Sequence, residues 1–304
     1  MPSDQLQAFT QMLWDAREPA GAVADASVEQ LREAMEQQLA GLPPVPGTVR
    51  EAAEAGGVPA EWTRPGGAEP AGTVLYLHGG GYFQGSVGTH RRLVDAVCLA
   101  AGTRGLSVDY RLAPEHPFPA AVDDALAAYR WLIGPGGAEP GSVVVAGDSA
   151  GGGLAAALLV TLRDAGDPLP AGGYLLSPWT DLSGSGETLR TRRDLDPMID
   201  PDDIVTTARR YLPEGDLTEA RVSPLFADLS GLPPLLVHVG GAEVLYDDAA
   251  RLVTAAGTVG VETTFREWEG AFHVFQMFAG LLPEADEAVA EAGSWIRSRV
   301  GTPA

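Results

Sequence analysis

One serine stands where a strand pattern changes abruptly to a helix pattern. Four apolar residues, 143–146, lead into GDSAG at 147–151, and a Leu- and Ala-rich helical pattern follows. A serine at the apex of such a turn is exposed above the end of its strand, and the flanking glycines are needed because a Cβ would clash in so tight a bend. Amides of the following helix would stabilise negative charge beside Ser149. The stretch predicts a nucleophile elbow; the alternative is an incidental serine in a glycine-rich nucleotide-binding loop.

A second glycine run could supply hydrogen-bond donors to the reacting atoms. The strand pattern TVLYL at 73–77 ends at HGGGY, residues 78–82. Three consecutive glycines allow backbone amides to face inward over a site, as an oxyanion hole requires. The alternative is a flexible glycine loop, which would have the same sequence. The chain has no asparagine. Backbone amides must therefore form the oxyanion hole.

The order of the histidines restricts the choice of a base. A serine hydroxyl is a weak nucleophile unless a histidine, itself oriented by a carboxylate, accepts its proton. Where a nucleophile elbow stands on a parallel sheet, the chain order is serine, acid, histidine, each at the carboxyl end of a strand. Of five histidines, only His238 and His273 follow Ser149. His238 lies inside the apolar run LLVHV, which favours a structural role, so His273 is the predicted base.

Three carboxylates compete for the role of the acid. Glu243, Asp247 and Asp248 all follow the apolar run that contains His238. The two aspartates lie where a helix is expected to begin, and capping or the helix dipole explains them without catalysis. Glu243 lies directly in the turn. We predict Glu243 as the acid, with Asp247 as the alternative.

These residues need a frame of alternating strands and helices. Helical patterns separate the strand patterns, which lie at 73–77, 104–108, 143–146, 173–176, 235–240 and 263–268. Such alternation is typical of a parallel sheet covered by helices on both faces. Residues 49–64 favour two antiparallel edge strands.

Two segments interrupt this alternation. Residues 1–42 read as two amphipathic helices, and residues 183–223 contain no strand-like run. We expect one domain, 1–304, in which about 1–45 and 183–223 form a cap over the carboxyl edge of the sheet.

The composition of the 304-residue chain excludes several kinds of function. A formal net charge of −21 disfavours nucleic acid and anionic membranes as partners. The absence of lysine excludes a Walker A site, Schiff-base chemistry and a Ser-Lys dyad. The one cysteine, Cys98, fits a reducing compartment, and no membrane-spanning run or secretory signal is visible. We expect a cytoplasmic protein without cofactor, metal or stable membrane association.

Taken together, the motifs of the chain closely resemble those of the bacterial hormone-sensitive-lipase-like (family IV) esterases of the α/β-hydrolase superfamily, in the subgroup with GDSAG. They follow one another over most of the chain beyond the N-terminal helices: HGGGY at 78–82, DYRLAPEHPFPAA at 109–121, GDSAGG at 147–152, SPWTDL at 177–182, SPL at 223–225 and GLPPLLV at 231–237.

The resemblance implies an α/β-hydrolase fold, with a mostly parallel eight-stranded sheet, helices on both faces and a helical cap. It implies that His78 and Asp148 support the glycine loop. The oxyanion amides would come from Gly80, Gly81 and Ala150. Many members carry Asp-Pro-Leu where this chain has EVL at 243–245, so the resemblance places a glutamate in the acid position here.

The expected activity is hydrolysis of short-to-medium-chain neutral acyl esters, a small-molecule substrate class, by a Ser149–His273–Glu243 triad through an acyl-enzyme. The alternatives are a deacetylase or amidase of a specific metabolite, and a non-hydrolytic receptor, because the resemblance extends to plant gibberellin receptors. Those receptors have replaced the catalytic histidine, which is present here. The last strand and helix could form a homodimer. Candidate pocket residues are Tyr82 and Phe83, and other apolar residues of the expected cap region are Trp14, Trp179, Met198 and Tyr211.

Overall fold

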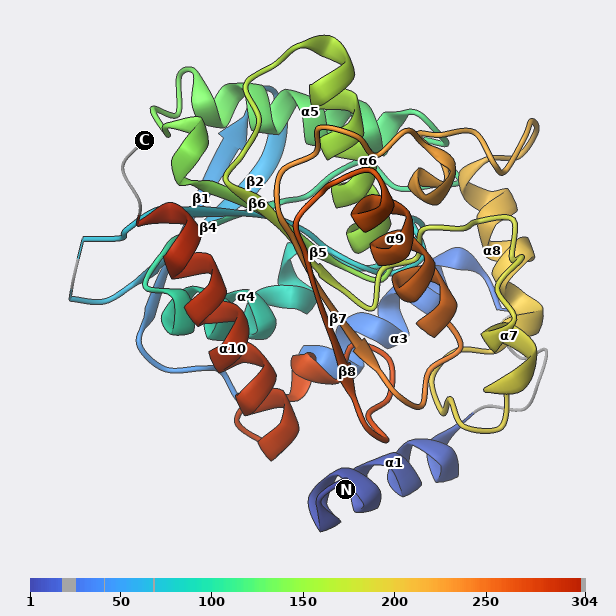
Figure 1. The fold of residues 1–304 in the computed structure, drawn as a ribbon. Coiled ribbons are helices and arrows are strands. Elements are labelled where there is room, and N and C mark those ends of the chain that lie inside the picture. The colour runs from blue at the N-terminus through green and yellow to red at the C-terminus, as the bar shows by residue number, and fades with distance from the viewer. Residues whose placement is uncertain (18–25, 41, 68, 302–304) are drawn as a thin grey trace.

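The computed structural model describes residues 1–17, 26–40, 42–67 and 69–301. One eight-stranded sheet crosses the molecule (Figure 1), in the order β1, β2, β4, β3, β5, β6, β7, β8. Strands β4, β3, β5, β6, β7 and β8 run parallel to one another. Strand β2 is antiparallel to both of its neighbours, β1 and β4. The predicted mostly parallel sheet is confirmed. Its strands are β1 (Thr48–Ala55), β2 (Val58–Pro65), β3 (Thr73–Leu77), β4 (Arg104–Val108), β5 (Val143–Asp148), β6 (Gly172–Leu176), β7 (Leu235–Gly240) and β8 (Thr263–Trp268).

Helices cover both faces of the sheet. Figure 1 shows α4 (Val87–Ala101) and α10 (Pro283–Val300) together on one face. The other face carries α5 (Ala120–Ile133), α6 (Ala150–Ala165) and α9 (Tyr246–Thr258). The remaining helices are α1 (Asp4–Ala16), α3 (Val28–Ala40), α7 (Thr188–Thr191) and α8 (Ile204–Tyr211).

The strand that leads to Ser149 is buried on both of its faces. Val143 and Val145 pack into the core under α5 and α6, whereas Val144 and Ala146 pack into the core under α4 and α10. Successive side chains of a strand point to opposite faces, so a strand covered on both sides must be apolar throughout. The position of β5 in the middle of the sheet explains the uninterrupted apolar run before the elbow.

The N-terminal helices contact both the glycine loop and the 183–223 segment. Arg17 donates from Nη1 to the carbonyl of Asp196 at 2.8 Å, and Arg32 donates from Nε to the carbonyl of Phe83 at 2.7 Å. Residues 183–223, all of them described, form no strand and carry α7 and α8, which lie to the right of the sheet in Figure 1. Part of the expected 1–45 segment, residues 18–25 and 41, lies outside the described residues. In the described part of the chain, no helix is both long and apolar enough to cross a membrane.

Candidate active site

Ser149 occupies the sharp turn between β5 and α6 in a conformation that side chains rarely adopt. Its backbone has φ 53° and ψ −123°. Three hydrogen bonds hold it there: its amide donates to the Leu176 carbonyl at 2.8 Å, and its carbonyl accepts from Trp179 at 2.9 Å and Gly153 at 3.1 Å. A non-glycine residue at positive φ persists only where its surroundings enforce it. The strained turn and these bonds fix the serine at the carboxyl end of β5.

The glycines on either side of Ser149 leave no room for a side chain. A Cβ at Gly147 would lie 2.3 Å from the Gly151 carbonyl oxygen, and a Cβ at Gly151 would lie 2.1 Å from that of Leu77. Both contacts are with backbone, which cannot rotate away. The elbow therefore requires glycine at both positions.

We expect Gly151→Ala to lower the free energy of unfolding by about 1–3 kcal/mol or more, because the added methyl group forces the first turn of α6 away from the end of β3. Thermal and urea unfolding followed by circular dichroism measure this. Gly141→Ala is the control, since a Cβ there meets nothing within 4 Å, and a change within about 0.5 kcal/mol is expected. Equal stability of the two variants would contradict the steric argument.

The glycine loop after β3 presents backbone donors. Gly80 and Gly81 have φ of 114° and 60°, and a Cβ at Gly80 would lie 2.2 Å from the Gln84 carbonyl oxygen. The Gly80 carbonyl accepts from Phe83 and Gln84, which closes a tight turn. Within the described ranges, the amides of Gly80, Gly81 and Ala150 donate to no protein acceptor. These three N–H groups are thus left for another acceptor.

Glu243 and His273 are joined by a short hydrogen bond. His273 Nδ1 lies 2.5 Å from Glu243 Oε2, while Glu243 Oε1 accepts the Gly240 amide at 2.7 Å. Glu243 is fully buried and His273 exposes 6% of its surface. The arrangement fixes the imidazole with a proton on Nδ1. No group among the described residues hydrogen-bonds Nε2, which leaves that nitrogen for a proton from elsewhere.

The surroundings of His273 favour its protonated form. Burial by itself lowers the pKa of His273, but the charge and hydrogen bond of Glu243, with the charges of Asp196 and Asp148, outweigh burial and raise the pKa above its ordinary value of 6.5. Stabilisation of an imidazolium is what a general base needs once it has accepted a proton.

The loop that carries His273 is tied to the strand beside Ser149. The Val274 amide donates to Ser177 Oγ at 3.2 Å, and Ser177 follows Leu176, whose carbonyl accepts the Ser149 amide. Val274 and Ser177 also adopt positive φ, 48° and 45°. The described residues show no hydrogen bond between Ser149 and the imidazole; such catalytic bonds commonly tighten only with substrate present. The structure thus brings His273 and Glu243 together at the carboxyl ends of the parallel strands, the same end of the sheet at which Ser149 lies.

Asp148 supports the glycine loop from beneath. Its Oδ1 accepts from the Gly79 amide at 3.0 Å and from the Tyr76 hydroxyl at 2.6 Å, and its Oδ2 lies 3.2 Å from His90 Nε2. Burial raises the pKa of Asp148, but the charge and hydrogen bond of His90 and the Tyr76 bond outweigh it, so the pKa is lowered. Sequence reasoning missed His90; its one signal was a histidine on an otherwise apolar helix face.

His78 braces the same loop as a neutral residue. Burial and the neighbouring His90 lower the pKa of His78 to about 3. A neutral ring can donate from Nδ1 to the Gly79 carbonyl, 2.8 Å away, and its face stacks on Tyr110 at 4.2 Å between centroids. His78 and Asp148 both contact the backbone of Gly79, and the support role that the family resemblance implies for them stays a prediction.

The alternative base and acid are held in other contacts. Burial lowers the pKa of His238 to about 3, and its Nδ1 lies 3.3 Å from the Tyr174 hydroxyl inside the sheet. Asp247 Oδ2 accepts the Thr188 amide at 3.0 Å. Asp248 Oδ2 accepts two backbone amides of the loop after β6. None of the three hydrogen-bonds His273 in the described structure.

The candidate pocket residues are packed aromatics. Tyr82 is buried, adopts φ 64° and stacks on Tyr211 at 3.9 Å between centroids. Phe83 is buried under the Arg210 guanidinium, 4.6 Å from its ring centroid. These contacts place both rings between the glycine loop and α8. Of the other apolar residues, Trp179 is buried 6.1 Å from Tyr82 between ring centroids, Trp14 lies under Arg17, and Met198 is 42% exposed.

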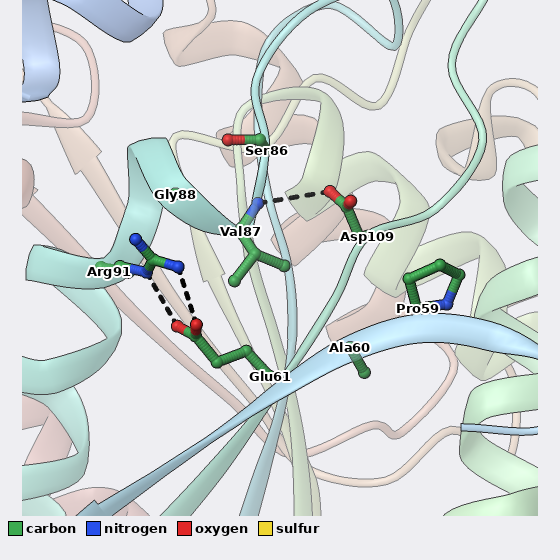
Figure 2. A pocket seen from close by; sticks show the side chains of 8 residues that line it. All are labelled: Pro59, Ala60, Glu61, Ser86, Val87, Gly88, Arg91 and Asp109. Atoms are coloured by element: carbon green, nitrogen blue, oxygen red, sulfur yellow. Dashed lines mark hydrogen bonds and ion pairs between the residues drawn. The ribbon is translucent and has the colours of Figure 1, made fainter. Parts of the chain in front are cut away.

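A separate surface groove of about 290 Å³ contains none of the predicted catalytic residues. Figure 2 shows an Arg91–Glu61 ion pair on one of its walls and a hydrogen bond from the Val87 amide to Asp109 Oδ1. The latter bond is 3.4 Å long. The groove is lined by Pro59, Ala60, Glu61, Ser86, Val87, Gly88, Arg91 and Asp109.

Comparisons with known proteins show the family to which the chain belongs. Residues 74–277 match the family model described as alpha/beta hydrolase fold. The acetyl-hydrolase of Streptomyces hygroscopicus is 48% identical over 242 residues, 80% of each chain, and an esterase of Acinetobacter venetianus is 37% identical over 74% of each.

A solved esterase of the bacterial hormone-sensitive lipase family is 43% identical, with a TM-score of 0.93 over 99% of this chain and 100% of that one. The structure of EstE5 soaked with p-nitrophenyl butyrate is 40% identical, with a TM-score of 0.94 over 99% and 100%. These relatives do not favour the amidase or receptor alternatives. The chain belongs to the bacterial hormone-sensitive lipase family of the α/β-hydrolase fold, and it is a carboxylic ester hydrolase.

Proposed function

We propose that the chain is a serine carboxylesterase that acts on short-to-medium-chain neutral acyl esters through a Ser149–His273–Glu243 triad. The observation that carries the proposal is the 2.5 Å bond between buried Glu243 and His273, at the sheet edge where Ser149 stands in its strained turn. The names of the acetyl-hydrolase and esterase relatives support the substrate class.

In the proposed mechanism, Ser149 Oγ attacks the ester carbonyl carbon while its proton passes to His273 Nε2. The carbonyl oxygen becomes an oxyanion that accepts hydrogen bonds from the amides of Gly80, Gly81 and Ala150. The tetrahedral intermediate collapses to the acyl-enzyme, and His273 protonates the departing alcohol. Water then attacks the acyl carbon while one of its protons passes to His273. The acyl–Oγ bond breaks, His273 returns that proton to Ser149 Oγ, and the carboxylic acid is released.

We propose further that 1–45 and 183–223 act together as a cap that limits the depth of the acyl pocket. The contact from Arg17 to the carbonyl of Asp196 supports this, as does the stacking of Tyr211 on Tyr82 of the glycine loop. A cytoplasmic location and a homodimer remain predictions from the sequence.

A series of p-nitrophenyl esters tests the substrate class. We expect kcat/KM to be highest among acetate, butyrate and hexanoate, and at least about tenfold lower for laurate, because a capped pocket cannot accommodate the longer chain. The matching p-nitroanilides serve as the comparison, and we expect them to be hydrolysed far more slowly. Preference for laurate, or faster cleavage of the anilides, would contradict the proposal.

The rate should fall on the acidic side as His273 gains a proton. Since Glu243 raises the pKa of His273 above 6.5, the acidic limb of kcat/KM should have its midpoint above pH 6.5. The raised pKa of His273 also affects stability. Protonated His273 stabilises the folded state fully below its unfolded-state pKa, and this contribution is lost as pH rises through its folded-state pKa. Rates of p-nitrophenyl acetate cleavage from about pH 5 to about pH 9 measure the limb; a midpoint below the ordinary histidine pKa would be inconsistent with this environment.

A further inference from the structure

The residues from Thr188 to Asp196 clasp the turn that carries Glu243. We refer to 188–196 as the clasp and to 241–247 as the acid loop. Side chains of the clasp form hydrogen bonds with backbone groups on both sides of Glu243. Its contacts are Thr188 Oγ1 to the Val244 carbonyl at 2.7 Å, the Asp247 amide to Thr188 Oγ1 at 3.0 Å, Arg192 Nη1 to the Gly241 carbonyl at 2.5 Å, and the Val244 amide to Asp196 Oδ2 at 2.9 Å.

Asp196 is the one charged side chain of the clasp that is fully buried. Its Oδ1 accepts the amides of Met198 and Ile199 at 2.8 and 3.0 Å, and its Oδ2 accepts the Val244 amide. No arginine in the described structure pairs with this carboxylate; Arg17 binds the backbone carbonyl of Asp196 instead. The carboxylate is thus held by three backbone amides without a counter-ion of its own.

The charges that act on the pKa of Asp196 are those of the proposed triad. Burial raises the pKa of Asp196; the charge of His273 and the bonded amides oppose this, and the charge of Glu243 adds to it. Correspondingly, the charges of Glu243, Asp196 and Asp148 raise the pKa of His273. A buried carboxylate without a counter-ion is costly, and the positive charge that forms nearby during turnover is that of the His273 imidazolium.

We propose that Asp196 is a positioning residue for the hydrolytic reaction: it fixes the acid loop through the Val244 amide and adds a second negative charge that stabilises protonated His273. This rests on the proposed function, because it assigns His273 as the base and Glu243 as the acid. It also makes one residue of the 183–223 segment part of the catalytic support, since Asp196 acts on the triad from that segment.

Asp196→Asn tests the proposal, because it keeps the size of the side chain, removes its charge and leaves only one oxygen to accept the backbone amides of Val244 or of Met198 and Ile199. We expect the acidic limb of kcat/KM for p-nitrophenyl acetate to move down by about one pH unit, since a neighbouring negative charge no longer favours the imidazolium. We expect kcat to fall about tenfold, as one pKa unit corresponds to a factor of ten, with KM within about twofold. A loss of folded enzyme alone would lower the apparent kcat at unchanged KM but would leave the acidic limb where it is, so the position of the limb is the discriminating readout.

The matched control is Asp194→Asn, two residues away and exposed, for which the wild-type limb and rate are expected. If Asp196→Asn does not fold, Asp196→Ser removes the charge with a smaller side chain, and the same shift is expected. An Asp196 variant that folds and keeps the wild-type limb overturns the inference, whatever its kcat. Titration of His273 by nuclear magnetic resonance needs no turnover, so it tests the inference even if esterase activity proves independent of Ser149, the result that would overturn the proposed function.

Discussion

Ser149→Ala is expected to reduce kcat for p-nitrophenyl acetate by about 10⁵- to 10⁶-fold, to the level that remains when a catalytic triad loses its nucleophile. The reason is chemical, since alanine offers no oxygen to form the acyl-enzyme. The fold should survive, because the elbow is held by backbone bonds of residue 149 that alanine can also make. Residual activity would come from the oxyanion amides and from substrate binding alone.

Covalent labelling provides the second readout for this variant. A fluorophosphonate should add once to the wild-type chain, as measured by intact mass, and not at all to Ser149→Ala. The control is Ser294→Ala, an exposed residue of α10 whose hydroxyl donates to the Ala290 carbonyl and accepts from Arg297 of the same helix, and it should retain both labelling and turnover. Undiminished hydrolysis by Ser149→Ala would remove the basis of the proposed mechanism.

The sequence predicted the parts of the site that local sterics dictate. The elbow can be recognised in the sequence because no residue but glycine fits at Gly147 and Gly151. The apolar run before it can be recognised because β5 is buried on both faces. The parallel sheet followed from the alternation of strand and helix patterns. Chain order then selected His273 from five histidines, since a strand interior explained His238.

The supporting contacts could not be predicted, because they join residues far apart in the chain. Asp196 meets Val244 across 48 positions, and Ser177 meets Val274 across 97. Neither partner belongs to a periodic pattern, and the 183–223 segment has turns and short helices with no regular spacing. Such contacts depend on how loops at the end of the sheet are packed, which one sequence does not encode in any local signal.

Glu243→Ala is expected to reduce kcat by about 10³- to 10⁴-fold, comparable to removing the acid of other serine triads. Two effects combine in this loss. The imidazole loses the partner that keeps its proton on Nδ1, and the imidazolium loses the nearest negative charge. Glu243→Gln should be nearly as slow. The amide oxygen can accept a hydrogen bond from Nδ1–H, but the side chain carries no charge and can present its NH₂ group to the ring instead.

Asp247→Ala is the comparison that separates the two candidate acids. Its carboxylate accepts the Thr188 amide and does not reach His273 in the described structure, so its removal should loosen the clasp and cost less than about tenfold in kcat. The acidic limb should keep its wild-type midpoint in Asp247→Ala, whereas both Glu243 variants should move it to lower pH, because the largest charge that raises the pKa of His273 is gone. The opposite ranking of the two alanine variants would transfer the role of the acid to Asp247, and it would require the acid loop to rearrange during turnover.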